Sequence, residues 1–149
     1  MERLERFHLV AGLVLDDALN GFPDYKPIDT IRIVETISGE KYPAQEYNPI
    51  SGTLEPALSE HQEEIRSLCD STISWLVDEG YLRGSSVASN IVVLTSKGQA
   101  VLGIRPLDEP DEPTFAEKLR SNVAQGAWSA VADSTKLLLL SGAGGALGF

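Results

Sequence analysis

The stretch TISWLVDEGYLR at residues 72–83, followed by IVVLTSKG at residues 91–98, decides how this chain folds. A helical pattern ends at the glycine of EGY, and the aromatic or β-branched residues on either side of the polar turn 84–90 suit short strands. Thr95 is a good N-cap, and it predicts a short helix to about Gly103. The sequence therefore predicts a helix, an antiparallel hairpin and a second, shorter helix.

The helix that leads into this stretch covers residues 59–79. Ser59 and Gln62 have the spacing of a capping box, which marks the start of a helix. One unbroken helix and a helix-turn-helix with a new start at Asp70 both fit the pattern. We expect Trp75 to anchor the core between this helix and the hairpin. The apolar stripe consists of Ile65, Leu68, Cys69, Thr72, Trp75 and Leu76.

A first helix is predicted over residues 3–19, and Asn20-Gly21 with Pro23 supplies its end. Leu9 and Leu13 lie off the main apolar stripe, which indicates a helix covered on two sides. The stripe itself consists of Leu4, Phe7, Val10, Ala11, Val14, Leu15 and Ala18.

Residues 24–57 give the weakest signal. Ile31, Ile33 and Ile37 alternate with polar residues, which predicts a short strand. Three prolines and a glycine argue against a helix from residue 42 to 57, so we expect an extended loop there. A loop of that length is unusual in a compact domain and leaves room for an unrecognised element.

The C-terminal third begins with a proline-rich acidic segment, residues 105–113, which predicts an extended linker. Thr114 and Glu117 form a second capping-box pattern, so a helix is expected from residue 114 to about residue 140, followed by a Gly/Ala-rich tail. The end of the chain is almost without charge and needs a cover. The residues predicted to mediate assembly are Trp128, Val131, Leu137, Leu138, Leu139 and Leu140.

The composition narrows the class of protein. The 149 residues carry a formal net charge of −10, which argues against a surface that grips nucleic-acid phosphates or anionic lipid throughout. The single cysteine suits a reducing compartment. Charges flank the first apolar run and no stretch approaches the length of a membrane span, so we expect a cytoplasmic protein.

The sequence offers no catalytic constellation, and we expect no cofactor, no metal and no enzymatic activity. His61 lies among glutamates in a first helical turn, where the helix dipole explains the acidity better than a metal does. Cys69 is predicted to be a small core residue rather than a nucleophile. The glycines of residues 142–148 are not followed by the helix and lysine of a phosphate-binding loop.

The pattern of residues 60–104 resembles the second half of a winged helix domain, in which a helix, a Glu-Gly-Tyr turn and a two-stranded wing lead to Leu-Thr-x-x-Gly. The resemblance implies an α+β, mainly helical fold, with a winged-helix-like domain over residues 1–104 and an appended C-terminal helix over 114–149. Winged helices serve both as DNA readers and as protein docking modules, so the fold does not decide the function.

Three functions follow as hypotheses. The helix at residues 59–79 holds six acidic residues and one arginine, which would repel phosphates and favours a non-enzymatic protein-interaction or regulatory subunit that assembles through its C-terminal helix. The first alternative is a DNA-binding transcriptional regulator that contacts phosphates through Arg83 and Lys97. The second is a membrane-active effector acting through its tail, although the charge-free run 137–149 is too short to span a bilayer.

Overall fold

The chain adopts a mainly helical α+β fold in the computed structural model, which describes residues 1–105 and 111–147, with side chains up to residue 142. The elements in chain order are α1 (Arg3–Gly21), β1 (Lys26–Pro27), α2 (Thr30–Ser38), β2 (Glu46–Asn48), β3 (Thr53–Glu55), α3 (Glu60–Asp78), β4 (Leu82–Gly84), β5 (Ile91–Leu94), α4 (Ser96–Leu102), α5 (Phe115–Gln125) and α6 (Trp128–Leu147).

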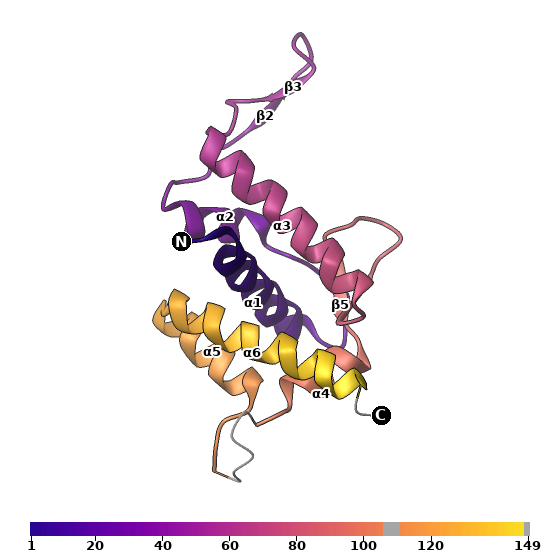
Figure 1. Ribbon diagram of the computed structural model, residues 1–149. Coiled ribbons are helices and arrows are strands. Elements are labelled where there is room, and N and C mark those ends of the chain that lie inside the picture. The colour runs from indigo at the N-terminus through magenta and orange to yellow at the C-terminus, as the bar shows by residue number, and fades with distance from the viewer. Residues whose placement is uncertain (106–110, 148–149) are drawn as a thin grey trace.

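Helix α1 is the centre of the molecule. Every residue from Leu9 to Leu15 is buried, so this part of the helix has no face in contact with water. It lies between α3 on one side and α5 with α6 on the other (Figure 1), and it also contacts β5. A helix that is apolar all round needs such cover, which confirms the prediction that α1 is enclosed on two sides.

Helix α2 corrects the predicted strand at residues 31–37. Asp29 caps the helix by accepting a hydrogen bond from the backbone N–H of Arg32, and Gly39 ends it in the left-handed conformation with φ 71°. Ile33 and Val34 are buried on the side toward the core. The spacings of two and four residues between the three isoleucines fit both the two-residue period of a strand and the 3.6-residue period of a helix. The caps at the two ends favour the helix.

A three-stranded antiparallel sheet has the order β1-β5-β4, so the strand earliest in the chain pairs with the last one. The β4–β5 hairpin was predicted, whereas β1 was not. Lys26 faces Val92 and Pro27 faces Ile91, which shows that β1 exists only because β5 lies beside it.

Helix α3 is one unbroken helix, which resolves the alternative that the sequence left open. Ser59 and Gln62 form the predicted capping box. Within the helix, the Thr72 hydroxyl donates a hydrogen bond to the carbonyl of Leu68. Thr95 caps α4 as predicted, by accepting a hydrogen bond from the N–H of Gly98.

Between α2 and α3 the chain forms a hairpin rather than the predicted extended loop. Strands β2 and β3 pair antiparallel, with Tyr47 opposite Leu54. The hairpin projects beyond the N-terminal end of α3 and away from the helical body (Figure 1). We call residues 44–57 the arm.

The C-terminal third contains two helices where one was predicted. Gly126 adopts φ 68° and ends α5, whose capping box at Thr114 and Glu117 was correctly predicted. Helix α6 then extends to Leu147, through most of the region expected to be a tail. Both helices pack against α1, and the buried residues Phe115, Leu119 and Val131 belong to the same core as those of α1.

Hydrogen bonds join the two ends of the acidic segment before α5. The N–H of Phe115 donates to the carbonyl of Ile104 at 2.9 Å, and Arg105 Nε donates to the carbonyl of Glu112 at 3.0 Å. The two ends of the segment therefore lie close together. Residues 106–110 of the predicted linker lie outside the described residues.

Candidate functional site

An apolar groove of about 610 Å³ lies between α1, the C-terminal end of α3 and α6. Leu4 and Leu140 border it and are 61% and 60% exposed. We call it the aromatic groove. Its lining residues are Leu4, Phe7, His8, Trp75, Glu79, Tyr81, Lys97, Lys136, Leu139 and Leu140.

Three aromatic side chains form the wall of the groove. Phe7 meets Trp75 edge to face with ring centroids 5.2 Å apart, and Trp75 stacks on Tyr81 at 6.3 Å. Trp75 is 36% exposed, so the prediction that it anchors the core is wrong. Its exposed apolar surface lines the groove. A second hollow shares Phe7 and Trp75 with the groove, and it is also lined by Arg3 and Leu68.

Charges of both signs line the groove and the hollows that adjoin it. Arg3, Lys97 and Lys136 line the two adjoining hollows together with one carboxylate, that of Glu79. Lys97 is held in place, since its Nζ donates to the backbone carbonyl of Glu79 at 2.7 Å and lies 4.5 Å from the centre of the Tyr81 ring. An adjoining recess shares Leu4, His8 and Lys136 with the groove, and it is also lined by the acidic residues Glu2, Glu5 and Asp133.

His8 adds no positive charge to the groove at neutral pH. Burial lowers the pKa of its imidazole below 6.5, and the ammonium of Lys136 lowers it further. The groove thus combines an aromatic wall, the two lysines Lys97 and Lys136, the carboxylate of Glu79 and a histidine whose pKa is lowered.

The six residues predicted for assembly divide between core and surface. Val131, Leu138 and Leu139 are buried, and Trp128 packs against the core from the start of α6. Leu137 and Leu140 are exposed, but only Leu140 lines the groove. The run of four leucines therefore contributes both to the buried core and to the exposed surface. Residue type alone does not distinguish the buried leucines from the exposed ones.

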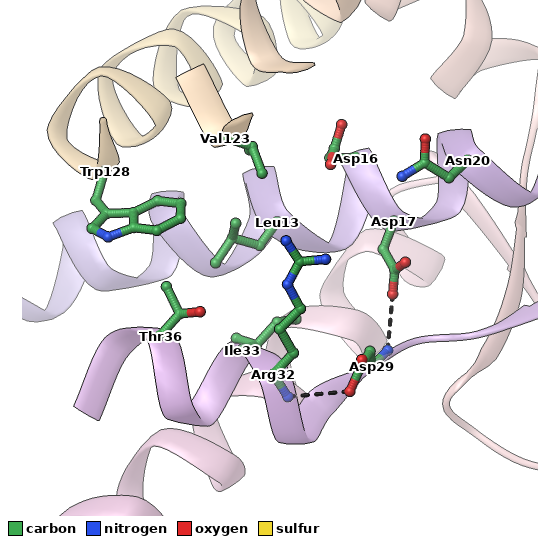
Figure 2. A pocket seen from close by; sticks show the side chains of 10 residues that line it. All are labelled: Leu13, Asp16, Asp17, Asn20, Asp29, Arg32, Ile33, Thr36, Val123 and Trp128. Atoms are coloured by element: carbon green, nitrogen blue, oxygen red, sulfur yellow. Dashed lines mark hydrogen bonds between the residues drawn. The ribbon is translucent and has the colours of Figure 1, made fainter. Parts of the chain in front are cut away.

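A second, polar cleft lies between α1, α2 and α5, where the ring of Trp128 covers Leu13 and Thr36 (Figure 2). Its volume of about 40 Å³ is far below the roughly 300–1,000 Å³ of sites that hold small molecules. Asp17 accepts the N–H of Asp29 at 2.8 Å and pairs with Lys26. Within the described residues, Oδ1 of Asp16 is buried without a hydrogen-bond partner.

Asp16→Asn is expected to raise the melting temperature at pH 7. Burial raises the pKa of the Asp16 carboxyl above 3.8, and this outweighs the lowering by Arg120. The folded state therefore binds this proton more tightly than the unfolded chain, and its stability falls as the pH rises from 3.8 through the folded-state pKa. The amide removes that loss, so the two melting temperatures should converge below pH 3.8. Thermal unfolding followed by circular dichroism checks this.

The neighbouring Asp17→Asn is the matched control for that experiment. It removes the ion pair with Lys26, so its melting temperature at pH 7 should fall rather than rise. Equal shifts for the two variants would contradict the assigned role of Asp16.

The remaining candidate residues have structural environments. Cys69 is fully buried, and burial raises the pKa of its thiol to about 12, so it is not a thiolate at neutral pH. Among the described residues, no three metal-ligating side chains gather at one place, the cluster around His61 included. Gly142 packs directly on Tyr81, because a Cβ there would lie 2.3 Å from the Tyr81 hydroxyl.

The part of α3 that the nucleic-acid alternative requires exposes acidic and neutral side chains. They include Asp70, Ser71, Ser74 and Asp78. Arg83 is exposed on β4, whereas Lys97 is engaged at the aromatic groove.

Comparisons of the chain with protein-family models, curated proteins and solved structures found no match. Within the described residues, none of the helices combines the length and the apolar character needed to cross a membrane.

Proposed function

We propose that this chain is a non-enzymatic protein-interaction module that binds an apolar segment of another polypeptide in the aromatic groove. The observation that carries the proposal is the groove itself, where Leu4, Phe7, Trp75 and Leu140 leave apolar surface open to water. Exposed, contiguous apolar surface rimmed by polar groups is typical of protein-binding sites. Aromatic anchors contribute most of the affinity at such sites.

We further propose that the body is a winged helix. Support comes from the succession of α1, β1, α2, α3, β4 and β5, in which the β2–β3 hairpin is inserted between α2 and α3, and from the sheet order β1-β5-β4. In this proposal the chain has kept the scaffold but has an acidic α3 surface, which favours protein docking over a DNA duplex.

The test uses a fluorescein-labelled amphipathic helical peptide with leucines at positions i, i+3, i+4 and i+7 and glutamates beside them, which can pair with Lys97 and Lys136 of the groove. We expect saturable binding by fluorescence anisotropy. Leu140→Asp should weaken the binding at least about tenfold, since it places a charge in the apolar groove. Leu137→Asp is the matched control, because Leu137 is equally accessible on the same helix but does not line the groove.

Two comparison titrations sharpen the result. A peptide with lysines in place of the glutamates should bind more weakly, and a labelled DNA duplex should show no saturable binding even at low salt. Binding that is equal for Leu140→Asp and Leu137→Asp would contradict the groove as the site. Duplex binding that weakens with salt and depends on Arg83 would favour the nucleic-acid alternative.

A further inference from the structure

The aromatic groove is one part of a longer trough that follows α3. The second hollow shares Phe7 and Trp75 with the groove, and it shares Arg3 with a third hollow of about 300 Å³. On α3 the lining of the trough extends from Glu64 to Glu79, which at about 1.5 Å per residue is roughly 22 Å. The trough therefore has the length of about four helical turns.

The floor of the trough has the side-chain spacing of packed helices. Leu4 and Phe7 of α1 contribute one row to it. Leu68, Thr72 and Trp75 of α3 contribute the other row, with spacings of four and three residues. Such rows form ridges and grooves that accept the side chains of another helix. An amphipathic helix with an apolar stripe is therefore the kind of segment that fits this floor.

The border of the trough beside α3 is positive. Arg3 and Arg6 line the third hollow together with one carboxylate, that of Glu64. Arg6 Nη1 lies 3.8 Å from Glu64 Oε1, so these two charges offset each other. Arg3 takes part in none of the ion pairs within the described part of the chain. This border therefore favours a carboxylate on the occupant.

The border beside α6 is negative. The recess there is lined by the carboxylates of Glu2, Glu5 and Asp133, and a single ammonium, that of Lys136, opposes them. None of these four side chains belongs to an ion pair among the residues that the structure describes. His8 also lies on this border, and its pKa is lowered, so it adds no charge at neutral pH. This border therefore favours lysine or arginine on the occupant.

The helical geometry of α1 separates the two signs. Consecutive residues are about 100° apart around a helix. Arg3 and Arg6 therefore project to the α3 side of the apolar row, and Glu5 projects to the α6 side. At the end of the trough, the ammonium of Lys97 and the carboxylate of Glu79 contribute one charge of each sign. The two long borders thus differ in sign.

We propose that the partner of the aromatic groove is an amphipathic helix with acidic residues along one flank of its apolar stripe and basic residues along the other. The acidic flank lies toward Arg3, and the basic flank lies toward Glu5 and Asp133. Charges beside an apolar seam determine which partner and which orientation a coiled coil accepts. This inference rests on the proposed function, because it states the chemistry of the segment that the same groove binds.

The test compares three labelled helical peptides that share one leucine stripe. The first has glutamates on both flanks, the second has lysines on both flanks, and the mixed peptide has glutamates on one flank and lysines on the other. Fluorescence anisotropy at low ionic strength should show the mixed peptide binding about three- to tenfold more tightly than the other two, because only this peptide pairs with both borders. This advantage should disappear at high salt.

Reversing the charge of one border should change the order of the three peptides. Arg3→Glu makes both borders acidic, so the all-lysine peptide should bind most tightly. Glu5→Lys combined with Asp133→Lys makes both borders basic, so the all-glutamate peptide should bind most tightly. All three substitutions together restore borders of opposite sign, and the mixed peptide should again bind most tightly.

Arg83→Glu is the matched control, because it changes the net charge as Arg3→Glu does. Arg83 is exposed on β4 and does not line the three hollows or the recess. Its substitution should leave the order of the peptides as in wild type. The proposal would be overturned by an order that the border substitutions do not change, or by one that Arg83→Glu changes as much as Arg3→Glu does.

Failure of this inference is distinguishable from failure of the proposed function. If all three peptides bind wild type equally well and Leu140→Asp weakens them all, the groove accepts an apolar helix without selecting its charges. That result would overturn this inference and leave the proposed function in place. If none of the peptides binds, both proposals are removed.

Discussion

Gly12→Val is expected to lower the free energy of unfolding by about 3 kcal/mol or more, at the upper end of what overpacking costs in a protein core. A Cβ at this position of α1 would lie 2.3 Å from Thr135 Oγ1 and 2.8 Å from Val131 Cγ1 on α6. Both are buried, and the Thr135 hydroxyl is already bonded to the Val131 carbonyl at 2.7 Å. Both neighbours are β-branched, so their side chains have little freedom to rotate away.

Replacing a glycine inside a helix normally gains about 1 kcal/mol or less in helix propensity, and a β-branched residue gains less than alanine. That gain is smaller than the cost of the clash, so the net effect is destabilising. For a chain of this length, the melting temperature should fall by roughly 10 °C. Urea and thermal unfolding followed by circular dichroism measure both quantities.

Gly103→Ala is the control for Gly12→Val, because a Cβ at Gly103 would make only ordinary contacts, the nearest at 3.5 Å. Its effect should stay within about 0.5 kcal/mol. Adding Thr135→Ala to Gly12→Val should restore part of the lost stability, since the two sites then couple through space. A Gly12→Val protein as stable as wild type would contradict the close packing of α6 on α1.

Leu138→Ala is expected to destabilise the chain by about 2–5 kcal/mol, whereas the same change at the adjacent Leu137 should cost no more than about 0.5 kcal/mol. Leu138 is 2% exposed and belongs to the core around α1, while Leu137 is 51% exposed. The substitution at Leu138 loses apolar burial and leaves a cavity. Chemical denaturation of both variants measures the difference.

This pair of leucines also separates two views of the C-terminal third. If α6 were free to bind another molecule through its whole apolar surface, Leu138→Ala would leave the unfolding free energy unchanged. Equal effects at the two positions would contradict the observed docking of α6 on α1. Loss of stability at Leu138 alone would support the division of the leucine run into a core side and an exposed side.

The elements that could be predicted are those whose signals are local. The capping boxes at Ser59 and Thr114 and the cap at Thr95 depend on hydrogen bonds within one helical turn. The β4–β5 hairpin has its strands and turn within a dozen residues. These features were predicted correctly because neighbours along the chain form them.

Other elements depend on contacts between distant residues. Strand β1 has two residues and exists by pairing with β5, more than sixty positions later. The packing of α6 on α1 depends on Gly12, whose role is invisible until Thr135 is placed beside it. The groove was missed for the same reason, because Phe7 and Trp75 lie on apolar stripes that are indistinguishable from core stripes in the sequence.

The sequence by itself determined that this chain is helical, acidic and without a recognisable catalytic constellation. Composition and capping patterns depend only on which residues are present and on their spacing along the chain. Only the tertiary structure decided which apolar residues are enclosed. Leu138 is buried while Leu140 opens onto the groove, although they are two residues apart, because α1 covers one side of α6 and leaves another uncovered. Burial depends on what other segments occupy the space, and that is settled by packing rather than by residue type.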